Sequence, residues 1–209
     1  MNEDALRLYF DELLEPWAHQ EQTRKRHWQE MVHRYSSPSR HYHNLRHLAH
    51  LYAELLPLQH QLHDPEAVGW ALFYHDIVYA PLRSDNEARS ADLAEQQLTS
   101  LGLPPETLAR IRTHILATQT HTSDGDGDTA YFLDADLSVL GASPEAYQAY
   151  AQGVRKEYWM IPQVVYQKER KKILLRFLER ERLFLTDYFW DRYQARARLN
   201  LSNEIAQLT

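Results

Sequence analysis

The apolar residues of this chain recur with the spacing of helices from one end to the other. Within residues 6–14 and again within residues 28–35, apolar side chains return every three or four positions. This period gathers them into one buried stripe on each segment. The alternation of apolar and polar residues that marks a strand does not persist for any useful length. We therefore expect an all-α bundle of about eight to ten helices.

Helix-breaking and capping residues divide this pattern into separate elements. Asp85 is placed to cap a helix that Gly102 would end, and Ser143 to cap another that opens with Pro144. The segment at 66–79 is apolar on nearly every face and predicts a central, buried helix. The remaining helices are expected near residues 6–14, 28–35, 43–56, 104–118, 162–184 and 186–208, with a loop at 58–65.

Length and composition set the broad class. The 209 residues, 44% hydrophobic and 25% charged, are enough for one domain with a well-buried core. No repeat and no low-complexity linker marks a boundary, so one domain over residues 1–209 is expected. The composition leaves a homo-oligomer open.

Charge and hydropathy exclude several partners. A formal net charge of −6 supplies no basic field for a DNA or RNA polymer. No apolar run approaches the ~18 residues that span a bilayer, and the acidic, amphipathic N-terminus is unlike a signal peptide. We expect a cytoplasmic protein with no membrane partner. Because cysteine is absent, any metal must be bound by His, Asp and Glu.

Histidines and aspartates are concentrated in three short stretches. In "HYHNLRHLAH", His43 and His47 are four residues apart, which on a helix places both on one face. His75 and Asp76 adjoin in the apolar "FYHDIVY", where burying both is costly unless a cation compensates them. "FLDADL" embeds two more carboxylates, Asp134 and Asp136, of which at least one is expected to be a metal ligand.

Each of these residues alone has a structural explanation, as a core histidine, a cap or half of an ion pair. His114, beside an apolar helix stripe, is interpreted in that way, or as a pocket wall. Together, the stretches offer a mixed nitrogen and oxygen set suited to a divalent metal ion. Mn, Mg, Zn, Fe, Co and Ni all remain candidates.

The chain resembles the HD-domain superfamily of metal-dependent phosphohydrolases, whose signature is a His, a later His-Asp doublet and a distant Asp. "YHNLRHL", "FYHDIVY", "DNEARSA" and "FLDADLSVLG" are similar to motifs of small bacterial members, and the resemblance spans roughly residues 40–208. It implies an HD-type helical bundle with a motif-bearing core at about 40–140 and C-terminal helices at about 144–208.

The resemblance also implies roles for these residues. "YHNLRH" is similar to a stretch of the cyclic-nucleotide phosphodiesterases in which the first His is a general acid and the second binds metal. This makes His43 the acid and His47 a ligand, although the opposite assignment also fits the superfamily pattern. His75 and Asp76 are the next ligands. The later Asp of "DAD" binds in the superfamily, which favours Asp136, with Asp134 as the alternate.

Outside the ligand set, six residues are candidates for contacting the substrate or the attacking water. Glu87 could orient a nucleophilic water, bind a second metal through water, or be a solvated residue at a helix end. His121 lies where relatives often carry a histidine pair and could ligate a second metal or contact phosphate, although Thr120 precedes it here and makes a two-metal centre less favoured. Arg155 and Lys156 offer cations for a phosphate group, as do Lys168 and Arg170, although such charges usually belong to a solvated face.

The resulting expectation is a metal-dependent phosphohydrolase that cleaves a phosphoester of a small phosphorylated metabolite, with a nucleotide as the leading candidate. Two alternatives stay open. One is a di-iron oxygenase of the HD type, and the other is a non-catalytic sensor or binding module in which a metal only joins helices.

Overall fold

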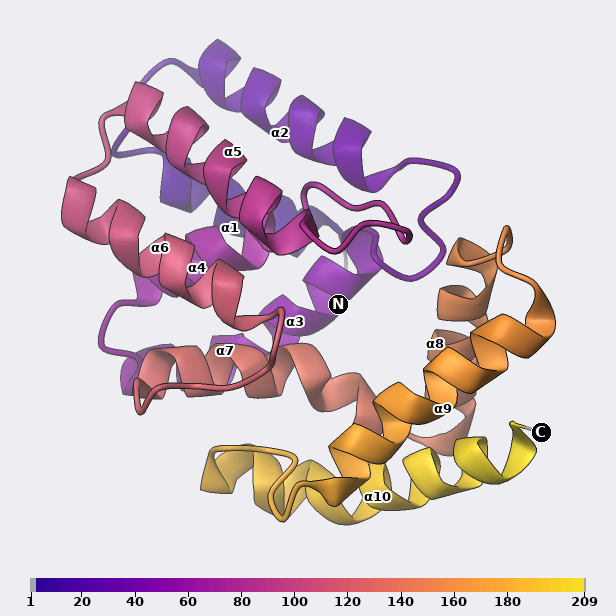
Figure 1. Ribbon diagram of the computed structural model, residues 1–209. Coiled ribbons are helices and arrows are strands. Elements are labelled where there is room, and N and C mark those ends of the chain that lie inside the picture. Colours follow the sequence, from indigo (N-terminus) through magenta and orange to yellow (C-terminus); the bar gives the residue numbers. More distant parts are fainter. Residues whose placement is uncertain (1–2, 209) are drawn as a thin grey trace. The chain divides into compact units, whose positions relative to one another are not determined.

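The computed structural model describes residues 3–208, and every regular element in that range is a helix. Ten α-helices and two short 3-10 helices follow one another, and no strand occurs among these residues (Figure 1). The all-α class predicted from the sequence is confirmed. Within the same range, no helix combines the length and the apolar character needed to cross a membrane.

The chain divides into two compact units, the first ending at Leu133 and the second beginning at Asp134. The boundary falls inside one helix, α7 (Gly127–Leu137). Each unit has its own packing and is described separately. The expectation of a single domain stays a prediction.

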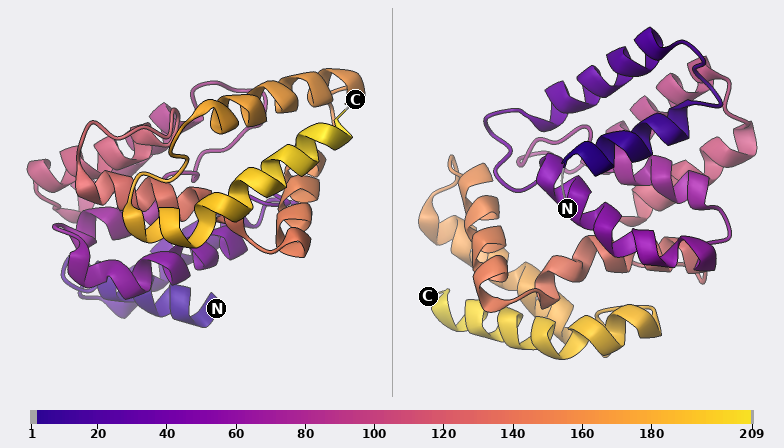
Figure 2. Two further views of the ribbon diagram at one scale, coloured as in Figure 1. Left: turned by 90° about the horizontal axis from the view of Figure 1, so that it is seen from below. Right: turned by 180° about the vertical axis from the view of Figure 1, so that it is seen from behind.

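In the first unit, α5 packs against α6, α6 packs against α4, and α1 contacts both α2 and α3 (Figures 1 and 2). Its elements are α1 (Glu3–Leu14), α2 (Glu21–Tyr35), α3 (Leu45–Leu55), the 3-10 helix η1 (Leu56–Gln61), α4 (Pro65–Tyr74), α5 (Asn86–Leu101), α6 (Pro105–Ala117) and the first part of α7.

Helix α4 is the centre of the first unit. Every residue from Ala67 to Tyr74 is buried, as its all-round apolar pattern predicts. Phe10 of α1 contacts this helix edge-on, with its ring centroid 4.8 Å from that of Phe73. Such aromatic pairs add about 0.5–1.5 kcal/mol beyond the area they bury. The buried α4 therefore gives its last residues a fixed position.

Two helices that carry candidate residues differ in their ends from the sequence prediction. Helix α3 begins at Leu45 rather than near residue 43, because the Asn44 side chain accepts a hydrogen bond from the Arg46 amide and caps the first turn. Helix α4 ends at Tyr74, so Asp76 lies in the turn beyond it. The sequence pattern predicts His43 and Asp76 within helices. In the structure, both lie outside them.

The predicted caps have mixed outcomes. Gly102 ends α5 with a left-handed φ of 93°, and the Ser143 hydroxyl accepts from the Ala146 amide, both as predicted. Asp85 occupies the N-cap position of α5, but its carboxylate pairs with Arg83 and does not cap the helix.

The second unit contains the end of α7, the 3-10 helix η2 (Ser138–Gly141), α8 (Pro144–Glu157), α9 (Gln163–Glu179) and α10 (Asp187–Gln207). Helix α10 packs against both η2 and α9, and Figure 2 shows α9 and α10 side by side. Buried polar groups join these elements. Asn200 donates to the Leu140 and Ala142 carbonyls, and Arg170 pairs with Glu204 at 2.8 Å.

Candidate metal centre

Two buried imidazoles face each other in the first unit. His47 lies in α3 with 4% of its surface exposed, and His75 lies at the C-cap of α4 with 1% exposed. Their Nε2 atoms are 3.1 Å apart. The apolar stripe of α3 and the buried α4 hold the two helices together, which brings histidines 28 positions apart into contact.

The other nitrogen of His75 fixes how its ring is protonated. Nδ1 lies 3.0 Å from the Leu72 carbonyl oxygen. A carbonyl can only accept, so Nδ1 carries the hydrogen and donates it. With that proton on Nδ1, a neutral His75 ring would present Nε2 as its lone-pair nitrogen, on the side of His47 and Asp76. This is the tautomer that a metal ligand needs, with the orienting hydrogen bond that metal-bound histidines usually make.

The Asp76 carboxylate lies beside the same two imidazoles. Its Oδ2 is 3.3 Å from Nε2 of His75 and 3.9 Å from Nε2 of His47, and the side chain is 16% exposed. Burial by itself would raise the pKa of Asp76. The nearby histidines outweigh it and hold the pKa of this carboxyl well below its ordinary value. Asp76 therefore contributes a negative charge to the site.

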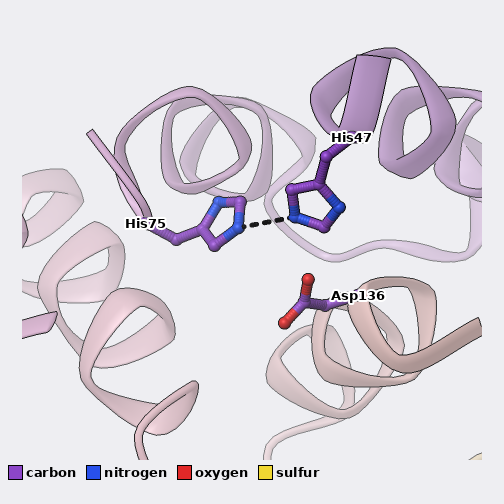
Figure 3. A group of neighbouring side chains, drawn as sticks. All are labelled: His47, His75 and Asp136. Atoms are coloured by element: carbon purple, nitrogen blue, oxygen red, sulfur yellow. Dashed lines mark hydrogen bonds between the residues drawn. The ribbon is translucent and has the colours of Figure 1, made fainter. Parts of the chain in front are cut away.

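Asp136 supplies a further carboxylate from the last turn of α7. Because the helix is continuous, Asp136 follows Phe132, which contacts the His75 ring, by about one turn. One ligand atom each of His47, His75 and Asp136 lies within 4.8 Å of the others, and Figure 3 shows the Asp136 carboxylate facing both imidazoles. Among the described residues, this group could hold a metal ion.

The donor set fits a divalent cation. Two nitrogen donors and one or two carboxylates suit borderline and hard divalent metals, and cysteine is absent from the chain. The carboxylates of Asp76 and Asp136 are half-buried beside the two imidazoles, where a bound cation would compensate their charge.

His43 lies at the edge of this cluster, in the loop before α3. Its Nε2 is 4.0 Å from Oδ2 of Asp76, and its side chain is 21% exposed. The ring packs on Tyr79, with centroids 4.3 Å apart, and meets Tyr42 edge-on. The sequence placed His43 and His47 on one helix face; instead, a loop brings His43 to the carboxylate of Asp76. It is more open to solvent than His47 or His75.

The two carboxylates of "DAD" have different surroundings. Asp134 is buried, and its oxygens accept hydrogen bonds from the Leu185 and Thr186 amides and the Thr186 hydroxyl, each at 2.7 Å. Burial raises its pKa, and these hydrogen bonds oppose that rise. Asp134 thus fixes the loop before α10, whereas Asp136 lies with the imidazoles.

Glu87 and His121 lie outside the group of His47, His75 and Asp136. Glu87 is in the first turn of α5 and is half-buried. His121 follows the end of α6 in a turn, with a positive φ of 49° that is uncommon for any residue but glycine. Their proposed contacts with water and phosphate stay predictions.

The cations predicted to meet phosphate are in the second unit. Arg155 donates to the Gln163 side chain and to the Tyr158 and Ile161 carbonyls, and its guanidinium lies over the Tyr166 ring. These contacts fasten the turn between α8 and α9.

Of the neighbouring cations, Lys156 and Lys168 are exposed, whereas Arg170 is buried against Glu204. Substrate binding by Arg155 and Lys156 stays a prediction.

Two residues near the cluster were missed at the sequence level. Arg40 is buried, with hydrogen bonds to the backbone of the His43 loop and of the turn at Asp76. Tyr79 forms a wall against His43. No periodicity marks either one, because their partners are backbone carbonyls and a loop side chain. The one clue in the sequence is position: Arg40 directly precedes "HYHNLRHLAH", and Tyr79 is the last residue of "FYHDIVY".

His114, interpreted from the sequence as structural or as a pocket wall, is buried in α6. Its Nδ1 lies 2.8 Å from the Thr129 hydroxyl, whose own hydrogen goes to Asp126. Burial lowers the pKa of His114, so the ring is neutral at physiological pH. Its contacts join α6 to the start of α7.

Comparisons with known proteins add no information on this group of residues. No protein-family model, no curated protein and no solved structure matches the chain.

Proposed function

We propose that this chain is a metal-dependent phosphohydrolase of the HD-domain type, acting on a phosphoester of a small phosphorylated metabolite. The observation that carries the proposal is the convergence of His47, His75 and Asp136 within 4.8 Å. The order of these residues, a His, a His-Asp doublet and a distant Asp, is the one that resembles the superfamily. The motif and the geometry thus support the same set of residues.

His47, His75, Asp76 and Asp136 would hold the metal. A divalent ion bound there would lower the pKa of a bound water toward neutrality and draw charge from a phosphoryl oxygen. The hydrogen bond from Nδ1 of His75 to the Leu72 carbonyl orients the ring and leaves Nε2 as the nitrogen that would bind the metal. The low pKa of Asp76 keeps that carboxylate charged across the range in which enzymes work.

His43 would donate a proton to the oxygen of the leaving group. Its Nε2 lies 4.0 Å from the Asp76 carboxylate, and partial exposure lets the ring reach a bound substrate and exchange its proton with water. His47 and His75 are almost fully buried and lack this access. Among the three imidazoles around Asp76, His43 is therefore the best placed to act as the acid.

A small substrate is favoured over a polymer. The net charge of −6 gives no basic field for a nucleic-acid backbone. The resemblance to nucleotide-directed relatives makes a nucleotide the first substrate to test. Glu87, His121, Arg155 and Lys156 remain the candidates for positioning water and phosphate.

The test combines metal analysis with a hydrolysis assay. Metal content is measured by elemental analysis, and phosphate release is followed with an aryl phosphate and a panel of nucleotides, with Mn²⁺, Co²⁺, Ni²⁺, Zn²⁺, Fe²⁺ or Mg²⁺ supplied. The variants are Asp76→Ala and His43→Ala. His41→Ala, which removes an exposed histidine from the same stretch, is the control.

We expect Asp76→Ala to lose both metal and activity. His43→Ala should keep the metal while its turnover falls by about 10²- to 10⁴-fold, the usual contribution of a general acid. His41→Ala should match the wild type. Absence of metal in the wild type would refute the proposal. Bound iron with a visible absorption band and no phosphoester hydrolysis would favour an oxygenase, and a metal without any turnover would favour a sensor.

A further inference from the structure

Arg40 is a buried cation that joins two loops of the candidate metal centre. One guanidinium nitrogen, Nη1, donates to the His43 carbonyl at 3.0 Å and to the Asp76 carbonyl at 2.7 Å. The other, Nη2, donates to the Ile77 carbonyl at 3.0 Å. Arg40 is 9% exposed. The same side chain therefore binds the backbone of His43 and the backbone of Asp76.

The surroundings of Arg40 are aromatic rather than acidic. Its guanidinium lies over the Tyr35 ring, 4.7 Å from the centroid, and near the Tyr79 ring, 5.4 Å from the centroid. Among the described residues, no carboxylate pairs with it. A buried charge of this kind is expensive unless its hydrogen bonds are well made. The three carbonyl contacts and the two rings are what compensate it.

We infer that Arg40 is a positioning residue that sets the distance between His43 and Asp76; the inference rests on the proposed function. The turn at 76–80 has other anchors, since the Val78 amide donates to the Ser90 hydroxyl and the Ala80 amide to the Asn86 side chain. Besides short-range backbone contacts and the Arg40 side chain, the loop at 41–44 has ring contacts between Tyr42 and His47 and between His43 and Tyr79. Loss of Arg40 should therefore loosen His43 more than Asp76.

Lysine cannot replace arginine in this role. An ammonium is a point charge on a flexible stem, whereas the planar guanidinium holds its donors in a fixed fork that reaches both loops at once. Arg40→Lys keeps the charge and removes the fork, and Arg40→Met removes both. Arg46→Met, which changes an exposed arginine in the first turn of α3, is the matched control.

The first measurement does not depend on activity. Hydrogen exchange of the backbone amides, followed by mass spectrometry, should be about tenfold faster over residues 41–44 in Arg40→Lys, while residues 76–80 and the Arg46→Met control stay at the wild-type rate. The affinity for Mn²⁺, measured by calorimetry, should stay within about threefold of the wild type, because Arg40 touches no ligand side chain. Unchanged exchange over residues 41–44 would overturn the inference.

The second measurement is a double-mutant cycle with His43. Arg40→Lys should lower kcat by about 10²-fold with KM nearly unchanged, since an ångström of misplacement costs that much. In the His43→Ala background, the same change should lower kcat by less than about threefold. Equal losses in both backgrounds would show a general structural role and would overturn the inference. Faster exchange in a chain that hydrolyses no phosphoester would support the positioning role while rejecting the proposed function.

Discussion

Asp134 and Asp136 are two positions apart on α7, and their carboxylates have different partners. The oxygens of Asp134 accept from the loop at residues 185–186, whereas Asp136 faces two imidazoles (Figure 3). Residues two apart on a helix point in directions about 200° from each other, so one sequence motif serves two purposes. This separation allows each role to be removed by itself.

Replacing these two residues should therefore separate stability from metal binding. Asp134→Ala leaves the Leu185 and Thr186 amides without their acceptor and should lower the free energy of unfolding by about 1–3 kcal/mol. Asp136→Asn should weaken Mn²⁺ binding by more than about tenfold with little effect on the metal-free protein. Urea unfolding and calorimetry measure the two quantities. Similar losses of metal affinity in both variants would contradict the division.

The sequence identified which residue types belong to the site but not all of their geometry. His47, His75 and the choice of Asp136 followed from the motifs, and these three residues do converge. Arg40 could not be found in this way, since its partners are the carbonyls of His43, Asp76 and Ile77, which every residue possesses. Contacts with backbone leave no pattern in the side chains.

At the level of elements, close helix contacts depend on two glycines that face a neighbouring helix. A Cβ at Gly141 in η2 would lie 2.8 Å from the Tyr193 carbonyl oxygen and 2.9 Å from its Cα, both backbone atoms of α10. A Cβ at Gly69 in α4 would meet the Tyr9 hydroxyl, the far end of a side chain, and lie 3.0 Å from a methyl of Leu13. Backbone yields less readily than a side chain.

Alanine at these positions should consequently have graded effects. Gly141→Ala should cost about 2–3 kcal/mol of unfolding free energy, and Gly69→Ala about 1–2 kcal/mol, since overpacking outweighs the gain in helix propensity. Gly127→Ala, whose new Cβ would have no neighbouring atom of the described residues within 4 Å, should stay within about 0.5 kcal/mol. Thermal and urea unfolding test the order, and a Gly69 variant less stable than the Gly141 variant would contradict it.

Helix periodicity predicted most elements but neither the first residue of α3 nor the last residue of α4. The apolar pattern predicted α4 as central, and its residues are indeed buried. It extended α3 back to residue 43, because His43 and His47 fit one helix face. The local hydrogen bond from the Arg46 amide to Asn44 decides the start instead. A cap is a single contact, and the periodicity of a whole segment does not record it.

For the molecule as a whole, metal binding should be coupled to folding stability. The candidate ligands come from α3, from the end of α4 and from α7, segments far apart in the sequence, so an unfolded chain cannot present them together. A metal at 100 times its dissociation constant adds about 2.7 kcal/mol to the free energy of unfolding. Calorimetric scans should show Tm rising with Mn²⁺ and returning to its starting value with a chelator.

His75→Ala should abolish that rise. A matched change at an exposed histidine, His41→Ala, should retain it. An equal rise in all three proteins would place the stabilising ion elsewhere.

The helical period of the apolar residues predicted the all-α class correctly. The division into two compact units within α7 has no counterpart in the sequence, because no linker or composition shift marks Leu133 or Asp134.

The contacts of Arg40 involve no group that titrates in the physiological range of pH. A guanidinium keeps its proton at every pH at which proteins remain folded, and the carbonyls it holds do not titrate. A histidine or carboxylate in its place would release the loop at one end of the pH range. The contacts of Arg40 with the His43 and Asp76 carbonyls should therefore persist in mildly acidic solution as they do in neutral solution.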